Sequence, residues 1–207
     1  MDDKIYELLI DPSKGFEVDK ISIVDFPAVE SNFLKFNNQS TKQSFSVNDE
    51  KMELLGVAMT PDKLIDRLDS NGNYFKVWFS KETIRQIAQH FFKSGYQHQI
   101  NLQHTDTMID AYVYQSYIVD YDKGIFPPKG VGEVNDGTWI VGMKIENNEV
   151  GKKVWDAVKK EIFNGFSIEG YFIDTLTKNF NHKDQYNHLL EELNAELDAF
   201  ITKYNIK

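Results

Sequence analysis

The chain has 207 residues, of which 41% are hydrophobic and 14% aromatic, enough for one globular domain with its own core and too apolar for a disordered chain. Its net charge of −9 disfavours non-specific binding to nucleic acid or anionic lipid, and the absence of cysteine excludes disulfides and thiolate metal sites. Because no apolar run approaches the roughly 20 residues that cross a bilayer, and because Met1-Asp2-Asp3-Lys4 does not resemble a signal peptide, we expect a soluble intracellular protein.

Short strands and a polar loop are predicted in the N-terminal quarter. Apolar runs predict strands over residues 5–10, 18–25 and 52–59, and Pro27 ends the second because proline lacks a backbone N–H. Residues 37–49 are polar, and we expect them to form a flexible surface loop.

Two local signals conflict between residues 60 and 79. Thr60-Pro61-Asp62 is typical of a helix start, whereas Ser70-Asn71-Gly72-Asn73 is typical of a hairpin turn. The hairpin needs strands near residues 63–68 and 74–79. We favour the hairpin.

Three helices are predicted from apolar residues at helical spacing. The first begins after Ser80 and ends at Ser94-Gly95, and the second covers residues 149–163 before Gly165. The third lies beyond Lys178, where an acidic segment carries an apolar stripe: Leu189, Leu190, Leu193, Leu197, Phe200, Ile201 and Tyr204. A helix of this kind is suited to binding a partner or a second copy of the chain.

Further strands are predicted over residues 100–104, 110–120, 139–145 and 166–173. Many short strands with few helices favour an α+β fold, a mostly antiparallel β-barrel with flanking helices, over a doubly wound sheet. We therefore expect a domain over residues 1–178 followed by the C-terminal helix over residues 179–207.

Ser167 lies in the glycine-bounded segment Gly165-Phe166-Ser167-Ile168-Glu169-Gly170. On an extended strand it shares a face with Glu169 and Tyr171, so its hydroxyl can reach a cleft, with backbone N–H groups near Gly165 for an oxyanion. From the segment alone an ordinary strand serine is the simpler interpretation, because the glycine spacing of a nucleophile elbow is absent.

A serine nucleophile needs a neighbouring base, and His104 is a candidate. It is expected on the apolar side of its strand with Ile100 and Leu102, where a histidine is usually a structural residue. Asp106, two positions on, is a weak candidate for orienting the imidazole.

Patterns for cofactors and metals are missing from the sequence. His182 and His188 are six residues apart, which does not suit a shared metal, and Gly130-Val131-Gly132 lacks the lysine of a phosphate-binding loop. The aromatic and basic residues are not interleaved in the pattern expected of a nucleic-acid-binding surface. We therefore expect no cofactor, no metal and no nucleic-acid partner.

Five blocks of the sequence resemble, in order, the XkdF-like phage serine proteases. They are residues 21–30 (ISIVDFPAVE), residues 74–84 (YFKVWFSKETI), residues 101–104 (NLQH), Gly137-Thr138-Trp139 with Val141-Gly142-Met143, and residues 165–170 (GFSIEG). This family is similar to the prohead (capsid maturation) proteases of tailed phages, which share a barrel fold with the herpesvirus assemblins. The resemblance covers roughly residues 5–173.

The resemblance implies that His104 is the general base and Ser167 the nucleophile. In such proteases the third residue varies and follows the serine. The resemblance therefore points to residues other than Asp106: Asp174, His182, His188, Glu191 or Glu192. The residues do not decide among them.

The expected function is that of a serine endopeptidase that cleaves scaffold and major capsid proteins, and itself, inside procapsids assembling in the host cytoplasm. The alternative is a catalytically silent structural or scaffolding component of the phage head that keeps the protease fold. Neither function requires a membrane or a cofactor.

Overall fold

The computed structural model describes residues 4–27, 34–36, 51–68 and 72–177. Apart from the end of the last strand, these residues belong to the unit Met1–Leu176. The expected loop over residues 37–49 and the expected helix over residues 179–207 lie outside them.

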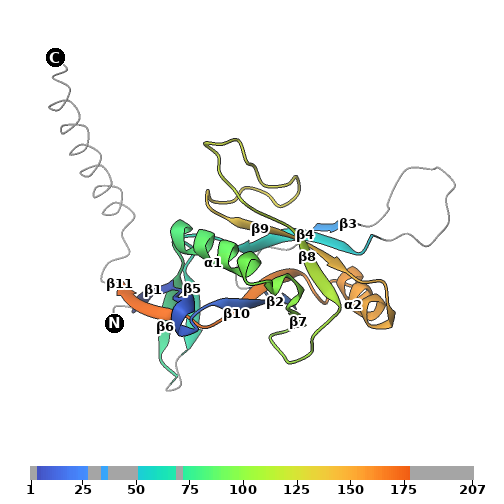
Figure 1. Ribbon diagram of the computed structural model, residues 1–207, viewed down its shortest axis with the longest axis horizontal. Coiled ribbons are helices and arrows are strands. Elements are labelled where there is room, and N and C mark those ends of the chain that lie inside the picture. Colours follow the sequence, from blue (N-terminus) through green and yellow to red (C-terminus); the bar gives the residue numbers. More distant parts are fainter. Residues whose placement is uncertain (1–3, 28–33, 37–50, 69–71, 178–207) are drawn as a thin grey trace, which may run out of the picture. The chain divides into compact units, whose positions relative to one another are not determined.

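Eleven strands in the described part form three sheets (Figure 1). One has the order β11 (Ile173–Thr177), β1 (Ile5–Leu9), β6 (Tyr74–Trp78), β5 (Ile65–Leu68); the second β10 (Gly165–Gly170), β2 (Val18–Val24), β7 (Ile100–Leu102); the third β3 (Leu34–Phe36), β4 (Glu53–Met59), β9 (Trp139–Ile145), β8 (Ala111–Ile118). The 3₁₀ turns η1 (Pro12–Lys14) and η2 (Tyr96–His98) lie between strands.

The α+β class is confirmed, but the closed barrel is wrong for the residues described. Pairs β1/β6 and β2/β7 are parallel, and each ladder ends at edge strands instead of continuing into the next sheet. Parallel neighbours need long crossover connections, which a periodicity of two along each strand does not reveal.

The hairpin between residues 60 and 79 is confirmed. β5 pairs antiparallel with β6, with Ile65 opposite Val77. Thr60-Pro61-Asp62 forms a turn and not a helix: Asp62 has a positive φ of 60° and donates its N–H to the carbonyl of Phe79.

Helix α1 (Lys81–Lys93) begins as predicted after Ser80, whose hydroxyl accepts the N–H of Thr83. Its buried side includes Phe91, which packs edge-to-face on Trp139 of β9 with ring centroids 5.7 Å apart. Burial of this apolar side, more than helix propensity, stabilises the helix against the sheets.

Helix α2 (Glu149–Lys159) is four residues shorter than predicted. Asn148 caps its first turn by accepting the N–H of Gly151. Gly151 is required there, because a Cβ would lie 2.0 Å from the carbonyl oxygen of Glu146.

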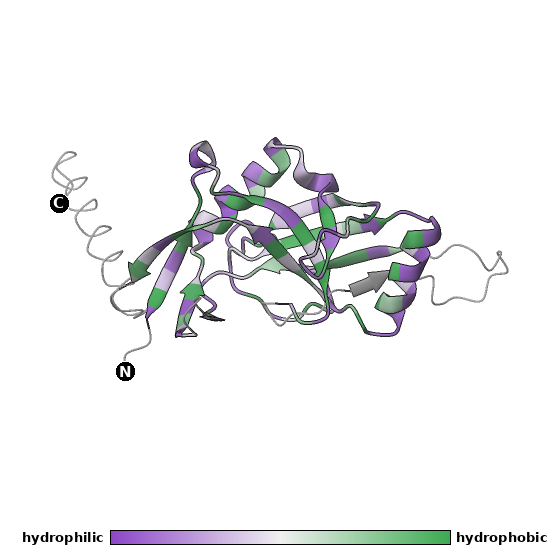
Figure 2. Ribbon diagram, turned by 90° about the horizontal axis from the view of Figure 1, so that it is seen from below, coloured by the Kyte–Doolittle hydropathy of each residue, from purple (hydrophilic) through white to green (hydrophobic). Residues whose placement is uncertain are grey.

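One main core joins residues of the strands and both helices, and hydrophobic and hydrophilic residues alternate along the strands around it (Figure 2). A smaller cluster (Leu55, Val57, Val119 and Ile140) packs with Tyr117, Val131 and Val134. Neither helix in the described ranges combines the length and apolarity of a membrane span.

The last predicted strand is two strands in the structure. The register of β10 shifts between Glu169 and Gly170, and the chain then continues as β11 in a different sheet. A Cβ at Gly170 would lie 2.2 Å from the carbonyl oxygen of Glu17, so only glycine fits this close approach. The close packing of Gly170 therefore fixes the position of the C-terminal end of β10, the strand that carries Ser167.

Candidate active site

The three-stranded sheet places three polar side chains in one row. Ser167 of β10 is paired with Ser22 of β2, and Ser22 is paired with Asn101 of β7. Side chains of directly paired residues lie on the same face of a sheet. Ser22 and Asn101 are 0% and 1% exposed and Ser167 is 8% exposed, so this polar row is buried within the sheet.

His104 does not continue the alternation of β7, and the expectation that it faces the apolar side is wrong. The strand ends at Leu102, and Gln103 and His104 have positive φ angles of 53° and 55°. Thr105 closes this turn by donating its N–H to the carbonyl of Leu102. Non-glycine residues in this conformation cost roughly 1–3 kcal/mol each and cluster at functional sites. The turn brings the imidazole, half exposed, to the face that carries Asn101.

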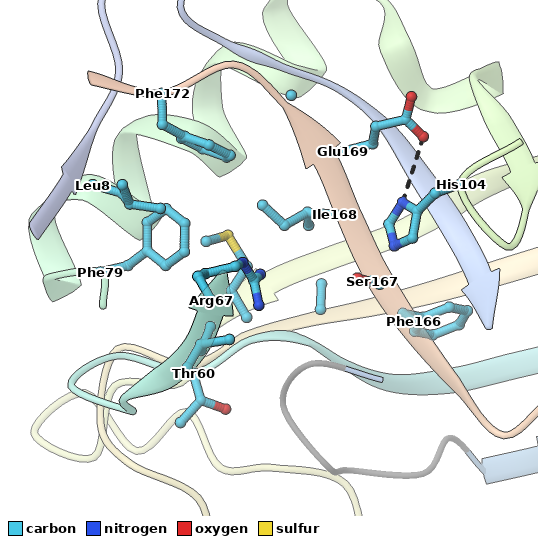
Figure 3. A pocket seen from close by; sticks show the side chains of 14 residues that line it. Leu8, Thr60, Arg67, Phe79, His104, Phe166, Ser167, Ile168, Glu169 and Phe172 are labelled. Carbon is cyan, nitrogen blue, oxygen red and sulfur yellow. Dashed lines mark ion pairs between the residues drawn. The ribbon is translucent and has the colours of Figure 1, made fainter. Parts of the chain in front are cut away.

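A hydrogen-bonded network surrounds the imidazole. Its Nδ1 lies 3.0 Å from Ser22 Oγ and 3.5 Å from Glu169 Oε2, the ion pair marked in Figure 3. The hydroxyl of Ser22 donates to Asn101 Oδ1, and Asn101 Nδ2 donates to Glu169 Oε2 at 2.8 Å. Four residues from three strands and one turn thus share a single network.

Glu169 is held in its ionised form. Burial raises the pKa of its carboxyl group, but the hydrogen bond from Asn101 and the positive charge of Lys20, with Nζ 3.5 Å from Oε1, outweigh burial and lower that pKa below its ordinary value. A carboxylate beside Nδ1 can orient an imidazole and stabilise the imidazolium that forms when His104 accepts a proton.

Asp106 does not occupy that position. It is exposed, and the structure gives no hydrogen bond or ion pair between its carboxylate and His104 within the described ranges. Asp174 lies on β11, in a different sheet. The other candidates, His182, His188, Glu191 and Glu192, lie outside the described residues. Sequence reasoning did not place Glu169 beside the imidazole, although its position two residues after Ser167 on one strand face was the available signal.

Ser167, His104 and Glu169 line one end of a cavity of about 470 Å³ (Figure 3). The rest of the wall is mostly apolar, with the guanidinium of Arg67 among side chains that include Leu8, Met59, Ile65, Phe79, Ile168 and Phe172. All of residues 166–170 line it, although neighbours along a strand point to opposite faces. β10 is also an edge strand of its sheet, so its outer edge is free of a strand partner among the described residues.

Of the two serines near His104, only Ser167 lines the cavity. Within the residues described, its hydroxyl has no hydrogen-bond partner. In Figure 3 the His104 ring lies between Glu169 and Ser167, with its second nitrogen on the side of the serine. Ser22 is fully buried behind this arrangement and cannot meet a substrate. The geometry therefore suits Ser167 for nucleophilic chemistry.

Across the described ranges, no group of three or more His, Asp or Glu side chains is arranged to hold an ion. The side chains of Ser167, His104 and Glu169 are of types that can carry out nucleophilic attack and proton transfer.

A family model described as "Putative phage serine protease XkdF" matches residues 41–175, about two thirds of the chain. That range includes β7 with Asn101, the following turn with His104, and β10 with Ser167 and Glu169, and it excludes Ser22. No curated protein and no solved structure matches the chain.

Proposed function

This chain belongs to the family of the phage serine protease XkdF, and from that premise we propose that it is a serine endopeptidase that processes scaffold and capsid proteins, and its own chain, during procapsid maturation. The observation that carries the proposal is the convergence of Ser167, His104 and Glu169 at one end of a cavity. Each residue type has the role that acyl transfer requires.

In the proposed reaction Ser167 Oγ attacks the scissile carbonyl carbon while its proton passes to Nε2 of His104. The carbonyl oxygen becomes an oxyanion, and collapse of this intermediate breaks the C–N bond as His104 returns the proton to the leaving amine. Water, deprotonated by His104, then hydrolyses the acyl-enzyme and restores Ser167. Glu169 stabilises the imidazolium in each half-reaction.

The pairing of β2 with β7 and β10 indicates which backbone N–H can donate a hydrogen bond to the oxyanion. Ile21 donates its N–H to Gln99, and Gln103 donates to Ile23, so Ile21 and Ile23 direct their main-chain groups toward β7. Because these groups alternate in direction along a strand, those of Ser22 face β10 and bond to its partner Ser167. The N–H of Ile168 therefore points to the free edge of β10, beside the nucleophile, and we assign it the oxyanion.

The same free edge favours an extended peptide as substrate. A substrate strand can add to β10 through main-chain hydrogen bonds, with its side chains placed in adjoining pockets. One such pocket is apolar and contains Phe79 and Phe172, whose rings pack edge-to-face with centroids 5.1 Å apart. The cavity is thus suited to a peptide with a large apolar side chain near the cleaved bond.

Co-expression with the major capsid and scaffold proteins tests the function. Wild-type protein should convert them to shorter products with defined termini, read by mass spectrometry, and Ser167→Ala should leave them intact because the nucleophile is gone. Ser13→Ala, at an exposed serine of η1 that does not line the cavity, serves as the matched control and should process normally. Processing by Ser167→Ala equal to wild type would contradict the assignment.

A silent structural component of the head is the second candidate, favoured by the lack of a hydrogen bond from Ser167 to His104 in the described part of the chain. A fluorophosphonate probe separates the two functions, since it labels only activated serines. Labelling of the wild type at Ser167, lost in Ser167→Ala, supports the enzyme; no labelling supports the silent component.

A further inference from the structure

We propose that Ser22 and Asn101 are positioning residues that hold the neutral imidazole of His104 in the tautomer with its proton on Nδ1. This leaves Nε2 as the bare nitrogen that faces Ser167. The catalytic consequence rests on the proposed function, whereas the tautomer is a property of the resting protein and can be measured without any substrate.

A count of donors and acceptors gives the tautomer. Asn101 Nδ2 donates to the carboxylate of Glu169, which is ionised and can only accept. The amide oxygen of Asn101 must therefore point to Ser22, and the single hydroxyl proton of Ser22 is donated to it. Ser22 Oγ has no proton left for His104, so the contact of 3.0 Å requires that Nδ1 donates.

The count of donors and acceptors holds because Ser22 and Asn101 are buried away from water. Ser22 and Asn101 are 0% and 1% exposed, and neither lines the cavity, so water does not replace a missing partner. The opposite tautomer would place the bare Nδ1 beside two acceptors, Ser22 Oγ and Glu169 Oε2. If Ser22 turned its proton toward that bare Nδ1, the buried Oδ1 of Asn101 would lose its donor, which favours the Nδ1–H form.

Glu169 alone does not provide the same control. Its Oε2 is 3.5 Å from Nδ1, at the outer limit of a hydrogen bond, and already accepts from Asn101 at 2.8 Å. Ser22 Oγ, at 3.0 Å, is the nearer acceptor for the imidazole proton. Ser22 and Asn101 thus link the carboxylate to the ring and fix the direction of every proton between them.

Nitrogen-15 NMR of the full chain measures the tautomer directly, because a protonated and a bare imidazole nitrogen differ widely in chemical shift. The chain has five histidines, so the His104 signals are assigned by their loss in His104→Gln. In the wild type at a pH where the ring is neutral, we expect protonated Nδ1 and bare Nε2. A ring protonated mainly on Nε2 would overturn the proposal.

Ser22→Ala removes the acceptor and should shift the ring toward a mixture of tautomers, whereas Ser22→Thr keeps the hydroxyl and should restore the Nδ1–H form. Ser116→Ala is the matched control, since Ser116 accepts the indole N–H of the buried Trp139 at 2.8 Å. It loses a comparable hydrogen bond and should leave the His104 signals unchanged. Equal tautomer populations in wild type and Ser22→Ala would contradict the role of Ser22.

Thermal unfolding of each variant identifies any that do not fold. If the methyl group of Ser22→Thr is not accommodated, Asn101→Ala replaces it as the second variant. It removes the acceptor of the Ser22 proton, which frees that proton to donate to Nδ1 and should increase the Nε2–H population. No such increase in a folded Asn101→Ala would overturn the proposal.

Peptide cleavage gives the second readout. Ser22→Ala should lower kcat about 10- to 100-fold with little change in KM, because the base and not the substrate site is misaligned. If the wild type cleaves nothing, the proposed function fails while the tautomer measurement still decides this inference. If the wild type cleaves and kcat is the same in Ser22→Ala, the positioning role is wrong.

Discussion

Glu169 is held by contacts that differ in strength. Asn101 donates to it at 2.8 Å, whereas His104 Nδ1 and Lys20 Nζ lie 3.5 Å away. The carboxylate is therefore anchored by the buried amide and acts on the partly exposed imidazole mainly through charge. The effect of the charge can therefore be tested by a substitution at Glu169 that keeps the shape of the side chain.

Glu169→Gln keeps the size of the side chain and removes its charge. We expect kcat to fall about 10- to 1,000-fold with KM little changed, less than for a fully buried triad acid because solvent screens a half-exposed imidazolium. Steady-state kinetics on a peptide from a mapped cleavage site, with the exposed Glu133→Gln as control, tests this. A kcat equal to wild type would show that the carboxylate is not the orienting acid.

The site could be predicted from the sequence only in part. Alternation along one strand places Ser167 and Glu169 on the same face, and the family blocks single out His104. The contact between Ser22 and His104 could not be foreseen, because it depends on the register of strands 79 residues apart. The direction of His104 depends on two positive φ angles, for which neither Gln103 nor His104 carries a strong signal.

At the scale of elements, local sequence signals predicted the structure correctly where an interaction between residues close in sequence determines it. The cap at Ser80 and the hairpin between β5 and β6 are of this kind. Strand pairing is harder to predict from local signals, because it depends on which residues the whole fold buries. The parallel pairing of β2 with β7 and the break at Gly170 are therefore outside what periodicity reveals.

Asp136 lies in the long connection between β8 and β9 and links it to α1 through an ion pair. It accepts from Lys81 Nζ at 2.9 Å and from the N–H of Tyr121 at 3.0 Å, and these two bonds lower its pKa. A lowered carboxyl pKa stabilises the folded state at all pH values above the unfolded pKa of about 4, and this contribution is lost as pH falls through the folded pKa.

Asp136→Asn should therefore reduce the free energy of unfolding at pH 7 by about 0.5–1 kcal/mol, a small value because both partners are well exposed. The difference from wild type should shrink as the pH is lowered below about 4. Urea unfolding over this pH range measures it, with Asp122→Asn in the same connection as control. A difference that stays constant with pH would contradict this role of the carboxylate.

At the scale of the whole molecule, the site is complete only when distant parts of the chain are assembled. Ser22, Asn101 with His104, and Ser167 with Glu169 come from three separate segments that meet in one sheet. All of them lie within the unit that ends at Leu176. Cleavage should therefore not need the residues that follow, and we propose that this acidic, amphipathic segment loads the enzyme into procapsids by docking on scaffold or on a second copy.

Removal of residues after Lys178 should then separate two properties of the protein. Cleavage of a short peptide should remain, because β11 and the site are intact, while the amount of enzyme inside isolated procapsids should fall to background. Leu193→Asp with Leu197→Asp in the full chain tests the apolar stripe itself, since burying a charge in an apolar interface is unfavourable. Ser167→Ala with its C-terminal segment intact should still be loaded. Normal loading of the shortened chain, measured by immunoblotting of procapsids, would require another role for the segment.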